Sequence, residues 1–366
     1  MKVIVVFGTR PEAIKMCPVI NELKKRTNID HKVVLTGQHR EMLDQVMTAF
    51  KVEADYDLKI MKAKQKLSDI NSRVLDGFTD ILIRENPDLV LVHGDTTSSL
   101  AAATAAFYQQ IPVGHVEAGL RTYDLNEPFP EEFNRQTVDL ISSLLFAPTE
   151  AAKNNLMQEG KCAEDIFVTG NTVIDALRTT VSEKYIDDNL KWAAEGIFIL
   201  MTMHRRESIG APMRQVFCAV KRIAEERKNV RIIYPVHKNP VVRKIAFEIL
   251  GGQENIRLIE PLDVMIFHNY LARCHFVLTD SGGIQEEAPS LGKPVLVLRN
   301  VTERPEGIEA GTLKLAGCDG NSVYDACEKL LGDKEIYELM SRAANPYGDG
   351  HASERICDAI SGFANI

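Results

Sequence analysis

Short runs of apolar residues alternate with longer amphipathic segments from one end of the chain to the other. The apolar runs are continuous stretches of Val, Ile and Leu, which indicates strands covered on both faces, as in a parallel sheet flanked by helices. The runs form two series, at 2–7, 32–37, 89–94, 111–118, 144–148 and 166–170, and then at 197–204, 230–237, 256–261, 275–282 and 294–299.

The amphipathic segments between these runs supply the helical crossovers that parallel strands require. The clearest of them lie at 39–50, 68–85, 212–227 and 322–331. This alternation predicts an α/β fold with two Rossmann-like, doubly wound domains. We expect the first domain at 1–172 and the second at 173–350. The last helical pattern, at 351–366, is free to pack anywhere, including back on the first domain.

Composition supports this division and narrows the class of protein. A chain of 366 residues exceeds the usual size of a single domain, and 45% hydrophobic with 26% charged residues is an ordinary globular composition. The net charge of −8 argues against a broad nucleic-acid surface. The cysteines are scattered and include no C-x-x-C pair, which is typical of a reducing cytosol. We also expect no membrane segment, because no apolar run is long enough to span a bilayer.

Residues just after the strands are the first candidates for a site, because ligands bind beyond the carboxyl ends of parallel strands. With two such sheets, we expect the site in a central cleft that both domains face. Arg10 and Lys15 follow the first strand near a helix N-terminus, which favours anions, although solvated charges on a capped helix explain them equally well. The segment lacks the P-loop and G-x-G-x-x-G patterns, which argues against P-loop ATP hydrolysis and NAD binding.

Acidic residues follow the next strands of the first half. Asp95 and Glu117 stand at the ends of neighbouring strands, and a helix opens soon afterwards with Glu131. Each of them alone fits helix capping or a surface ion pair. Their convergence suits proton transfer, because crowding or desolvation raises a carboxyl pKa towards the working range of a general acid or base. Arg135 shares a helix face with Glu131 and is expected to position it.

The second half adds groups that suit an anion. His204 and the two arginines after it stand at a strand end, and residues 281–283 open a helix whose backbone N–H groups can meet a phosphate. Glu286 and Glu287 follow in the first helical turn as candidate acceptors for ribose hydroxyls, and Arg304 lies near the same edge. No H-E-x-x-H or Cys/His ligand spacing is present, so we expect no metal. A serine nucleophile lacks its G-x-S-x-G turn.

The motifs at these strand ends are, in chain order, FGTRPEAIKM, VHGDTTS, VEAGLRT, PEEFNRQ, MHRRES, YPVHKNP and TDSGGIQEEAPSLGKPVLVLRNVTERPEGIEAGT. Along nearly the whole chain they resemble the non-hydrolysing bacterial UDP-N-acetylglucosamine 2-epimerases. The resemblance implies a GT-B arrangement of the two domains, a cytoplasmic homodimer, and no cofactor. It also implies interconversion of UDP-N-acetylglucosamine and UDP-N-acetylmannosamine, which supplies N-acetylmannosamine for cell-surface polysaccharides.

The family eliminates UDP to leave a 2-acetamidoglucal and adds UDP back after the other face of C2 is protonated. By this resemblance the catalytic residues are Asp95, Glu117, Glu131 and His204. The matching residues that hold the nucleotide or support the site are Arg10, Lys15, Arg135, Phe267, Ser281, Gly282, Gly283, Glu287 and Arg304. Which carboxylate takes the proton and which gives it stays open.

Several bacterial members also bind a second UDP-N-acetylglucosamine as an activator. The matching positions here are Gln38, Glu41, Lys64, Arg205 and His237. Some relatives carry Gln in place of Glu41 and Arg in place of Lys64. Lysine lacks the bidentate fork of arginine, and a carboxylate lacks the donor of an amide, so the resemblance is weaker at this site.

Three other functions fit the same fold. A hydrolysing epimerase would release free N-acetylmannosamine, and a GT-B glycosyltransferase would need an acceptor. A catalytically silent sensor of UDP-sugars would lack a carboxylate at position 95, 117 or 131, and none is missing. The acidic cluster is also heavier than sugar transfer needs. The sequence therefore favours the epimerase.

Overall fold

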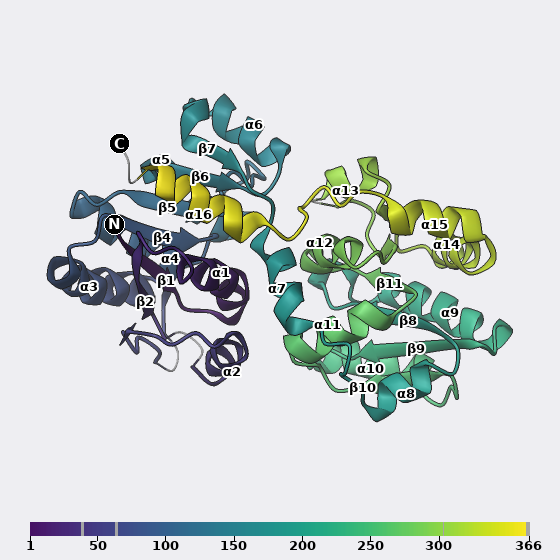
Figure 1. Cartoon of the computed structure of the whole chain (residues 1–366). Coiled ribbons are helices and arrows are strands. Elements are labelled where there is room, and N and C mark those ends of the chain that lie inside the picture. Colours follow the sequence, from purple (N-terminus) through teal and green to yellow (C-terminus); the bar gives the residue numbers. More distant parts are fainter. Residues whose placement is uncertain (38–39, 63–64, 303, 364–366) are drawn as a thin grey trace. The chain divides into compact units, whose positions relative to one another are not determined.

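The structure, a computed structural model, describes residues 1–37, 40–62, 65–302 and 304–363. The chain folds into two compact units (Figure 1). The first unit comprises Met1–Thr179 and Tyr347–Ile366, and the second comprises Thr180–Pro346. The chain thus leaves the first unit after Thr179 and returns to it at Tyr347, whereas the sequence pattern placed these boundaries after residues 172 and 350.

The first unit is built on a parallel sheet with the strand order β3-β2-β1-β4-β5-β6-β7. Its strands are β1 (Lys2–Phe7), β2 (Asp30–Leu35), β3 (Tyr56–Asp57), β4 (Leu89–His93), β5 (Val113–Val116), β6 (Leu144–Ala147) and β7 (Ile166–Val168). Its helices are α1 (Arg10–Leu23), α2 (Arg40–Phe50), α3 (Leu67–Glu85), α4 (Thr97–Tyr108), α5 (Glu131–Ile141), α6 (Glu150–Gln158), α7 (Thr172–Thr180) and α16 (Ala352–Phe363), with a 3-10 turn η1 (Ala163–Asp165).

The second unit repeats this plan with the parallel order β10-β9-β8-β11-β12-β13. Its strands are β8 (Ile197–Thr202), β9 (Val230–Pro235), β10 (Ile256–Ile259), β11 (Phe276–Thr279), β12 (Val295–Val297) and β13 (Leu313–Leu315). Its helices are α8 (Asp188–Ala193), α9 (Ala211–Glu226), α10 (Pro240–Leu250), α11 (Val264–Arg273), α12 (Gly282–Ser290), α13 (Pro305–Glu309), α14 (Gly320–Gly332) and α15 (Lys334–Arg342), with a 3-10 turn η2 (Arg206–Ser208).

Both sheets are covered on both faces, as the continuous apolar runs predicted. In β8, Ile199 and Met201 pack with α9, α10 and α14 in one core cluster. Phe198 and Leu200 point to the other face and pack with α8, α11 and α12 in a second cluster. Successive side chains of a strand point to opposite faces, so a strand that is buried on both sides must be apolar at every position.

The predicted α/β class with two Rossmann-like units is confirmed. The sequence pattern missed only strands at the sheet edges among those described, namely β3 and β13. They are two and three residues long, and partly exposed residues dilute their apolar signal. Edge strands have one neighbour, so a short strand with mixed burial is enough to extend the sheet.

The C-terminal helix α16 packs against α1 of the first unit. Arg26 forms an ion pair with Asp358 at 2.9 Å, and Cys357 is buried beside the carbonyl of Val19. Of the helices in the described ranges, none has both the length and the apolar composition needed to cross a bilayer.

Candidate functional site

The strand orders indicate where a ligand would bind in each unit taken by itself. The order reverses between β1 and β4 in the first sheet and between β8 and β11 in the second. Open α/β sheets bind ligands at such switch points, outside the carboxyl ends of the strands. The loops that follow these strands carry four of the predicted site residues, Asp95, His204, Arg205 and Ser281.

The loop after β1 is fixed by the buried carboxylate of Glu12. Thr9 caps α1, and Glu12 accepts the backbone N–H groups of Gly8 at 2.9 Å and Thr9 at 2.7 Å. The other oxygen of Glu12 accepts the hydroxyls of Thr96 at 2.7 Å and Ser99 at 2.8 Å. This capping box therefore ties the start of α1, with Arg10 as its first residue, to the start of α4.

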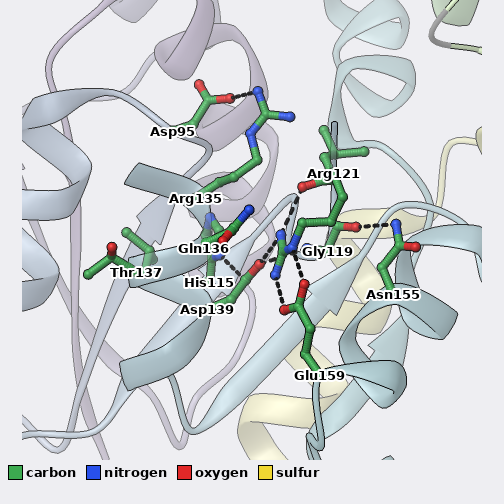
Figure 2. A network of polar contacts seen from close by, with 12 residues as sticks. Asp95, His115, Gly119, Arg121, Arg135, Gln136, Thr137, Asp139, Asn155 and Glu159 are labelled. Atoms are coloured by element: carbon green, nitrogen blue, oxygen red, sulfur yellow. Dashed lines mark hydrogen bonds and ion pairs between the residues drawn. The ribbon is translucent and has the colours of Figure 1, made fainter. Parts of the chain in front are cut away.

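Asp95 lies between β4 and α4, but it does not cap the helix. Thr96 is the N-cap of α4, which leaves the Asp95 carboxylate to pair with Arg135 of α5 at 2.7 Å (Figure 2). The side-chain amide of Asn134 donates to the backbone carbonyl of Asp95 at 2.8 Å. Burial raises the pKa of Asp95, and the nearby Glu117 adds to the rise against the opposing charge of Arg135.

Glu117 follows β5 in a backbone conformation that non-glycine residues rarely adopt, with φ of 71°. Its carboxylate forms an ion pair with Lys15 and accepts from the side-chain amide of Asn171 at 3.1 Å. His93 Nε2 lies 3.7 Å away. Burial alone would raise the pKa of Glu117, but Lys15 and His93 outweigh it and hold that pKa well below its ordinary value.

Asp95 and Glu117 therefore lie on adjacent loops with pKa values shifted in opposite directions. A Cβ added to Gly94, the residue before Asp95, would stand 3.9 Å from Glu117 Oε1, so the two loops are close. Environments that separate the pKa values of two titratable groups are typical of acid–base pairs. The predicted convergence of these two carboxylates is thus seen in the geometry.

The predicted pairing of Arg135 with Glu131 is wrong. The guanidinium contacts Asp95, and it also lies 3.6 Å from Glu132. Helical spacing places Glu131 and Arg135 on one face, but the loop that carries Asp95 covers that face and offers a closer carboxylate. Glu132 is buried and accepts the N–H groups of Thr122 and Tyr123 at 3.0 Å, so it anchors the loop before α5.

The loop after β8 in the second unit is held by Asp280, which directly follows β11. Asp280 is fully buried and accepts the backbone N–H groups of His204 and Arg205, both at 2.8 Å. The ring of His204 stacks on that of His237, with centroids 5.3 Å apart. Burial and the neighbouring His237 lower the pKa of His204 in spite of Asp280, which favours a neutral imidazole.

Two arginines lie over the N-terminus of α12. Ser281 is the N-cap, and Gly282 and Gly283 are the first helical residues. A Cβ added to Gly282 would stand 3.6 Å from Arg205 Nη2 and 3.7 Å from Arg304 Nη2. The positive end of the helix dipole and two guanidinium groups therefore lie together, an arrangement that suits an anion. Arg304 is also paired with the carboxylate of Glu286.

Glu287 and Phe267 lie on the neighbouring helices α12 and α11. His268 Nε2 is 3.3 Å from Glu287, and His268 Nδ1 is 2.7 Å from the hydroxyl of Thr180. Phe267 is half-buried against the apolar cluster on the same face of the second sheet. Glu286 faces Arg304, so of the two glutamates predicted as ribose acceptors only Glu287 keeps its carboxylate away from that cation.

The predicted activator positions are only partly described. Gln38, Lys64 and the side chain of Glu41 lie outside the described residues. Arg205 and His237 lie with residues that were assigned to the substrate, beside Gly282 and His204 respectively. Among the residues that the structure describes, no group of three His, Cys, Asp or Glu side chains could hold a metal ion.

Sequence reasoning missed three polar residues of these loops. His93 ends β4, Asn171 follows β7, and Asp280 follows β11. Each stands at the carboxyl end of a strand, which was a usable signal. Lys15 was assigned to the nucleotide, whereas the structure pairs it with Glu117.

The comparisons with known proteins agree with the motifs. A family model described as UDP-N-acetylglucosamine 2-epimerase matches residues 21–361. The UDP-N-acetylglucosamine 2-epimerase of Bacillus subtilis strain 168 is 56% identical over 360 residues, which cover 98% of this chain and 95% of that protein. A crystal structure of a UDP-N-acetylglucosamine 2-epimerase superposes with a TM-score of 0.94 at 54% identity, and the match covers 100% of this chain and 96% of that one.

A relative with bound ligand has the same fold over the whole chain. The structure of UDP-GlcNAc 2-epimerase from Neisseria meningitidis bound to UDP-GlcNAc matches with a TM-score of 0.89 at 48% identity. The match covers 99% of this chain and 100% of that one. Family model, sequence identity and fold agree over nearly the full length, and the chain belongs to the UDP-N-acetylglucosamine 2-epimerase family.

Proposed function

We propose that this protein is a non-hydrolysing epimerase that interconverts UDP-N-acetylglucosamine and UDP-N-acetylmannosamine at C2. The observation that carries the proposal is the pair Asp95 and Glu117, which lie on adjacent loops with pKa values shifted in opposite directions. Membership of the family supplies the substrate. Two carboxylates of unequal proton affinity are what a reaction needs when it removes a proton from one face of a carbon and returns one to the other.

In the proposed reaction Glu117 is the base and Asp95 is the acid for one direction. The C1–O bond breaks, UDP leaves with the electron pair, and Glu117 accepts the C2 proton, which leaves the 2-acetamidoglucal double bond. Asp95 then gives its proton to the opposite face of C2 while the phosphate oxygen of UDP adds back to C1. The reverse direction exchanges the two roles, and exchange with water restores the starting protonation states.

Lys15 tunes this pair. Its ammonium group stabilises the ionised form of Glu117, so Glu117 is free of a proton when substrate arrives. If the negative diphosphate of the substrate draws the Lys15 charge away, the pKa of Glu117 rises and its proton affinity grows at the moment of reaction. Glu131, the first residue of α5, is retained as the third catalytic carboxylate on the family resemblance.

The second unit is proposed to hold UDP while it is detached. The backbone N–H groups of Ser281, Gly282 and Gly283, together with Arg304, meet the diphosphate at the N-terminus of α12. His204 acts beside the diphosphate, Glu287 accepts from ribose hydroxyls, and Phe267 meets the uracil ring. Arg10 of the first unit adds a cation at the N-terminus of α1. Arg135 supports the site by holding Asp95.

The test is incubation with UDP-N-acetylglucosamine in deuterated water, followed by proton NMR with no cofactor added. The proposal predicts deuterium at C2 together with UDP-N-acetylmannosamine. Free N-acetylmannosamine would instead identify a hydrolysing epimerase. Binding without exchange or product would contradict the proposal and favour a sensor, and turnover only with an acceptor would favour a glycosyltransferase.

We further propose that the protein acts in the cytoplasm as a homodimer, by analogy with the family. Equilibrium sedimentation of the purified chain tests the oligomeric state. A mass of twice 40.8 kDa is expected, and a single species of 40.8 kDa at micromolar concentration would contradict it.

A further inference from the structure

Helix α5 contacts the loops that carry both catalytic carboxylates. Near its start, Asn134 and Arg135 hold the backbone and the carboxylate of Asp95. One turn later Asp139 projects from the same face as Arg135, and only 1% of its surface is exposed. Nothing in the proposed reaction uses Asp139 directly, yet both of its carboxylate oxygens have polar or charged partners.

Asp139 is bound to the loop of Glu117 (Figure 2). One carboxylate oxygen accepts the backbone N–H of Gly119 at 3.1 Å, two residues after Glu117. The same oxygen lies 2.8 Å from Arg121 Nη1. Gly119 has φ of 84°, and a Cβ there would stand 2.3 Å from the carbonyl of Ala152, so the loop packs tightly against α6 at this residue.

The other oxygen of Asp139 reaches the loop of Asp95 through His115. His115 is fully buried, its Nδ1 is 2.6 Å from Asp139, and its Nε2 is 2.8 Å from the carbonyl of Gly94. His115 thus contacts the Asp139 carboxylate through one ring nitrogen and the Gly94 carbonyl through the other. Gly94 directly precedes Asp95. The buried contact between Asp139 and His115 therefore joins the two catalytic loops.

Arg121 is the second buried partner of the Asp139 carboxylate. Arg121 has a fully buried side chain and also binds Glu159 through two hydrogen bonds, at 2.7 and 2.6 Å. Burial would raise the pKa of Asp139, but His115 and Arg121 lower it below its ordinary value, so Asp139 is ionised. Buried ion pairs are weak stabilisers compared with apolar packing. Their presence under two catalytic loops is better explained by the positions that they enforce.

We propose that Asp139 is a positioning residue for the reaction. Through Gly119 it sets the position of Glu117, and through His115 and Gly94 it sets that of Asp95. The two carboxylates thereby keep the separation needed to serve opposite faces of the sugar ring. This inference rests on the proposed function, because it assigns Asp139 to the same acid–base pair.

The first experiment is Asp139→Asn in the full chain. The amide keeps the shape but cannot accept from both His115 and Gly119 with a full negative charge. A displacement of about 1 Å costs about 100-fold in rate, so kcat should fall by about 100-fold while KM stays within about threefold. The matched control is Glu159→Gln, which weakens the other carboxylate bound to Arg121 but leaves the contacts of Asp139 with Gly119 and His115 in place, and its kcat should stay within about threefold.

A double-mutant cycle separates positioning from stability. If Asp139 acts through Glu117, Asp139→Asn combined with Glu117→Gln will be less impaired than the product of the two single effects. Glu159→Gln combined with Glu117→Gln should lower kcat by the product of the two single effects. Multiplicative loss for Asp139→Asn, or a folded variant with unchanged kcat and a lower Tm, would overturn the inference.

Further controls separate a variant that does not fold, and a failure of the proposed function, from a failure of the positioning role. If Asp139→Asn does not fold, His115→Gln removes the link between the two loops from the other side, and the same fall in kcat at constant KM is expected. If the wild type shows no exchange at C2, the proposed function fails. If the wild type exchanges normally and the folded variants of Asp139 and His115 do as well, the positioning role alone is wrong.

Discussion

The two switch-point edges use polar groups in different ways. At the edge of the first unit, ionisable groups are bound to one another, with Glu117 on Lys15, Asp95 on Arg135, and Asp139 bridging to His115. At the edge of the second unit the donors point to the N-terminus of a helix, and the side chain of His204 is 40% exposed. Rigid pairing tunes and places carboxylates for proton transfer, whereas cations gathered at a helix N-terminus suit a ligand that brings its own negative charge.

The fixed charges of the two edges differ accordingly. The second edge draws its positive charge from arginines, which stay protonated under all working conditions, and the pKa of His204 is lowered. The first edge contains carboxyl groups with pKa values displaced in both directions. We therefore expect substitutions of the carboxylates in the first edge to change kcat, and substitutions of the arginines in the second to change KM.

The largest expected effect is that of Glu117→Gln. The amide fills the same space but cannot accept the C2 proton, and general acid–base catalysis contributes about 10²–10⁴-fold. We expect kcat to fall by about 10³-fold with little change in KM. Steady-state kinetics with UDP-N-acetylglucosamine measures both. A rise in KM at constant kcat would contradict the assignment of proton transfer to the first edge and of ligand binding to the second.

The next effect concerns the tightness of the first edge. Gly119→Ala places a Cβ 2.3 Å from a backbone carbonyl at φ of 84°, so we expect a loss of about 3 kcal/mol in the free energy of unfolding. Gly252 in the second unit has a similar φ of 79° with open space around it. Gly252→Ala should cost about 1 kcal/mol. Urea denaturation measures the free energy of unfolding of both variants. Equal losses would mean that the positive φ, and not the close carbonyl of Ala152, determines the cost.

Arg304→Lys tests the second edge. Lysine keeps the charge but lacks the planar fork that binds a phosphate through two hydrogen bonds. We expect KM to rise by about tenfold, which corresponds to about 1.4 kcal/mol, with kcat changed by less than about threefold. Isothermal titration calorimetry with UDP compares the binding affinities of the wild type and Arg304→Lys in the absence of turnover. A fall in kcat with unchanged affinity for UDP would contradict the assignment of this edge to binding.

The smallest expected effect is a change in acid stability. The pKa of Asp139 lies below its ordinary value of 3.8 because of His115 and Arg121, and Lys161 and Glu159 are further charged groups near this cluster. A lowered pKa gives stability that is present above about pH 4 and is lost as the pH falls through the folded pKa. Asp139→Asn removes this dependence.

Urea denaturation between about pH 6 and pH 3 should therefore show a steeper loss for the wild type than for Asp139→Asn. Glu159→Gln serves as the control, because it leaves Asp139 and both of its cations in place. An equal slope in wild type and Asp139→Asn would mean that Asp139 does not titrate as an ion paired only in the folded state.

The fold could be predicted from sequence where burial dictates composition. β1 and β8 are apolar at nearly every position because both faces of each sheet are covered. β3 and β13 could not be predicted, since edge strands of two or three residues need no apolar run. The apolar pattern was sufficient to predict a strand wherever both faces of that strand are buried.

The candidate site could be predicted only as far as strand ends reveal it. Asp95 and Glu117 stand directly after strands, so topology alone brings them together. The partners of these carboxylates come from distant parts of the chain, such as Lys15, which is 102 residues from Glu117. Arg135 was assigned to Glu131 because helical spacing shows which residues share a face but not which loop covers that face. Asp139 gave no signal, since a buried carboxylate has no sequence pattern of its own.

The most direct test of the central claim is a carbon NMR titration of the Asp95 and Glu117 carboxyl groups in the free protein. Difference spectra against Asp95→Asn and Glu117→Gln assign the two signals. Burial raises the pKa of Asp95 above its ordinary 3.8, and Lys15 and His93 hold the pKa of Glu117 well below its ordinary 4.5, so we expect Glu117 to titrate at the lower pH. If Glu117 instead holds its proton to the higher pH, the assignment of base and acid is contradicted.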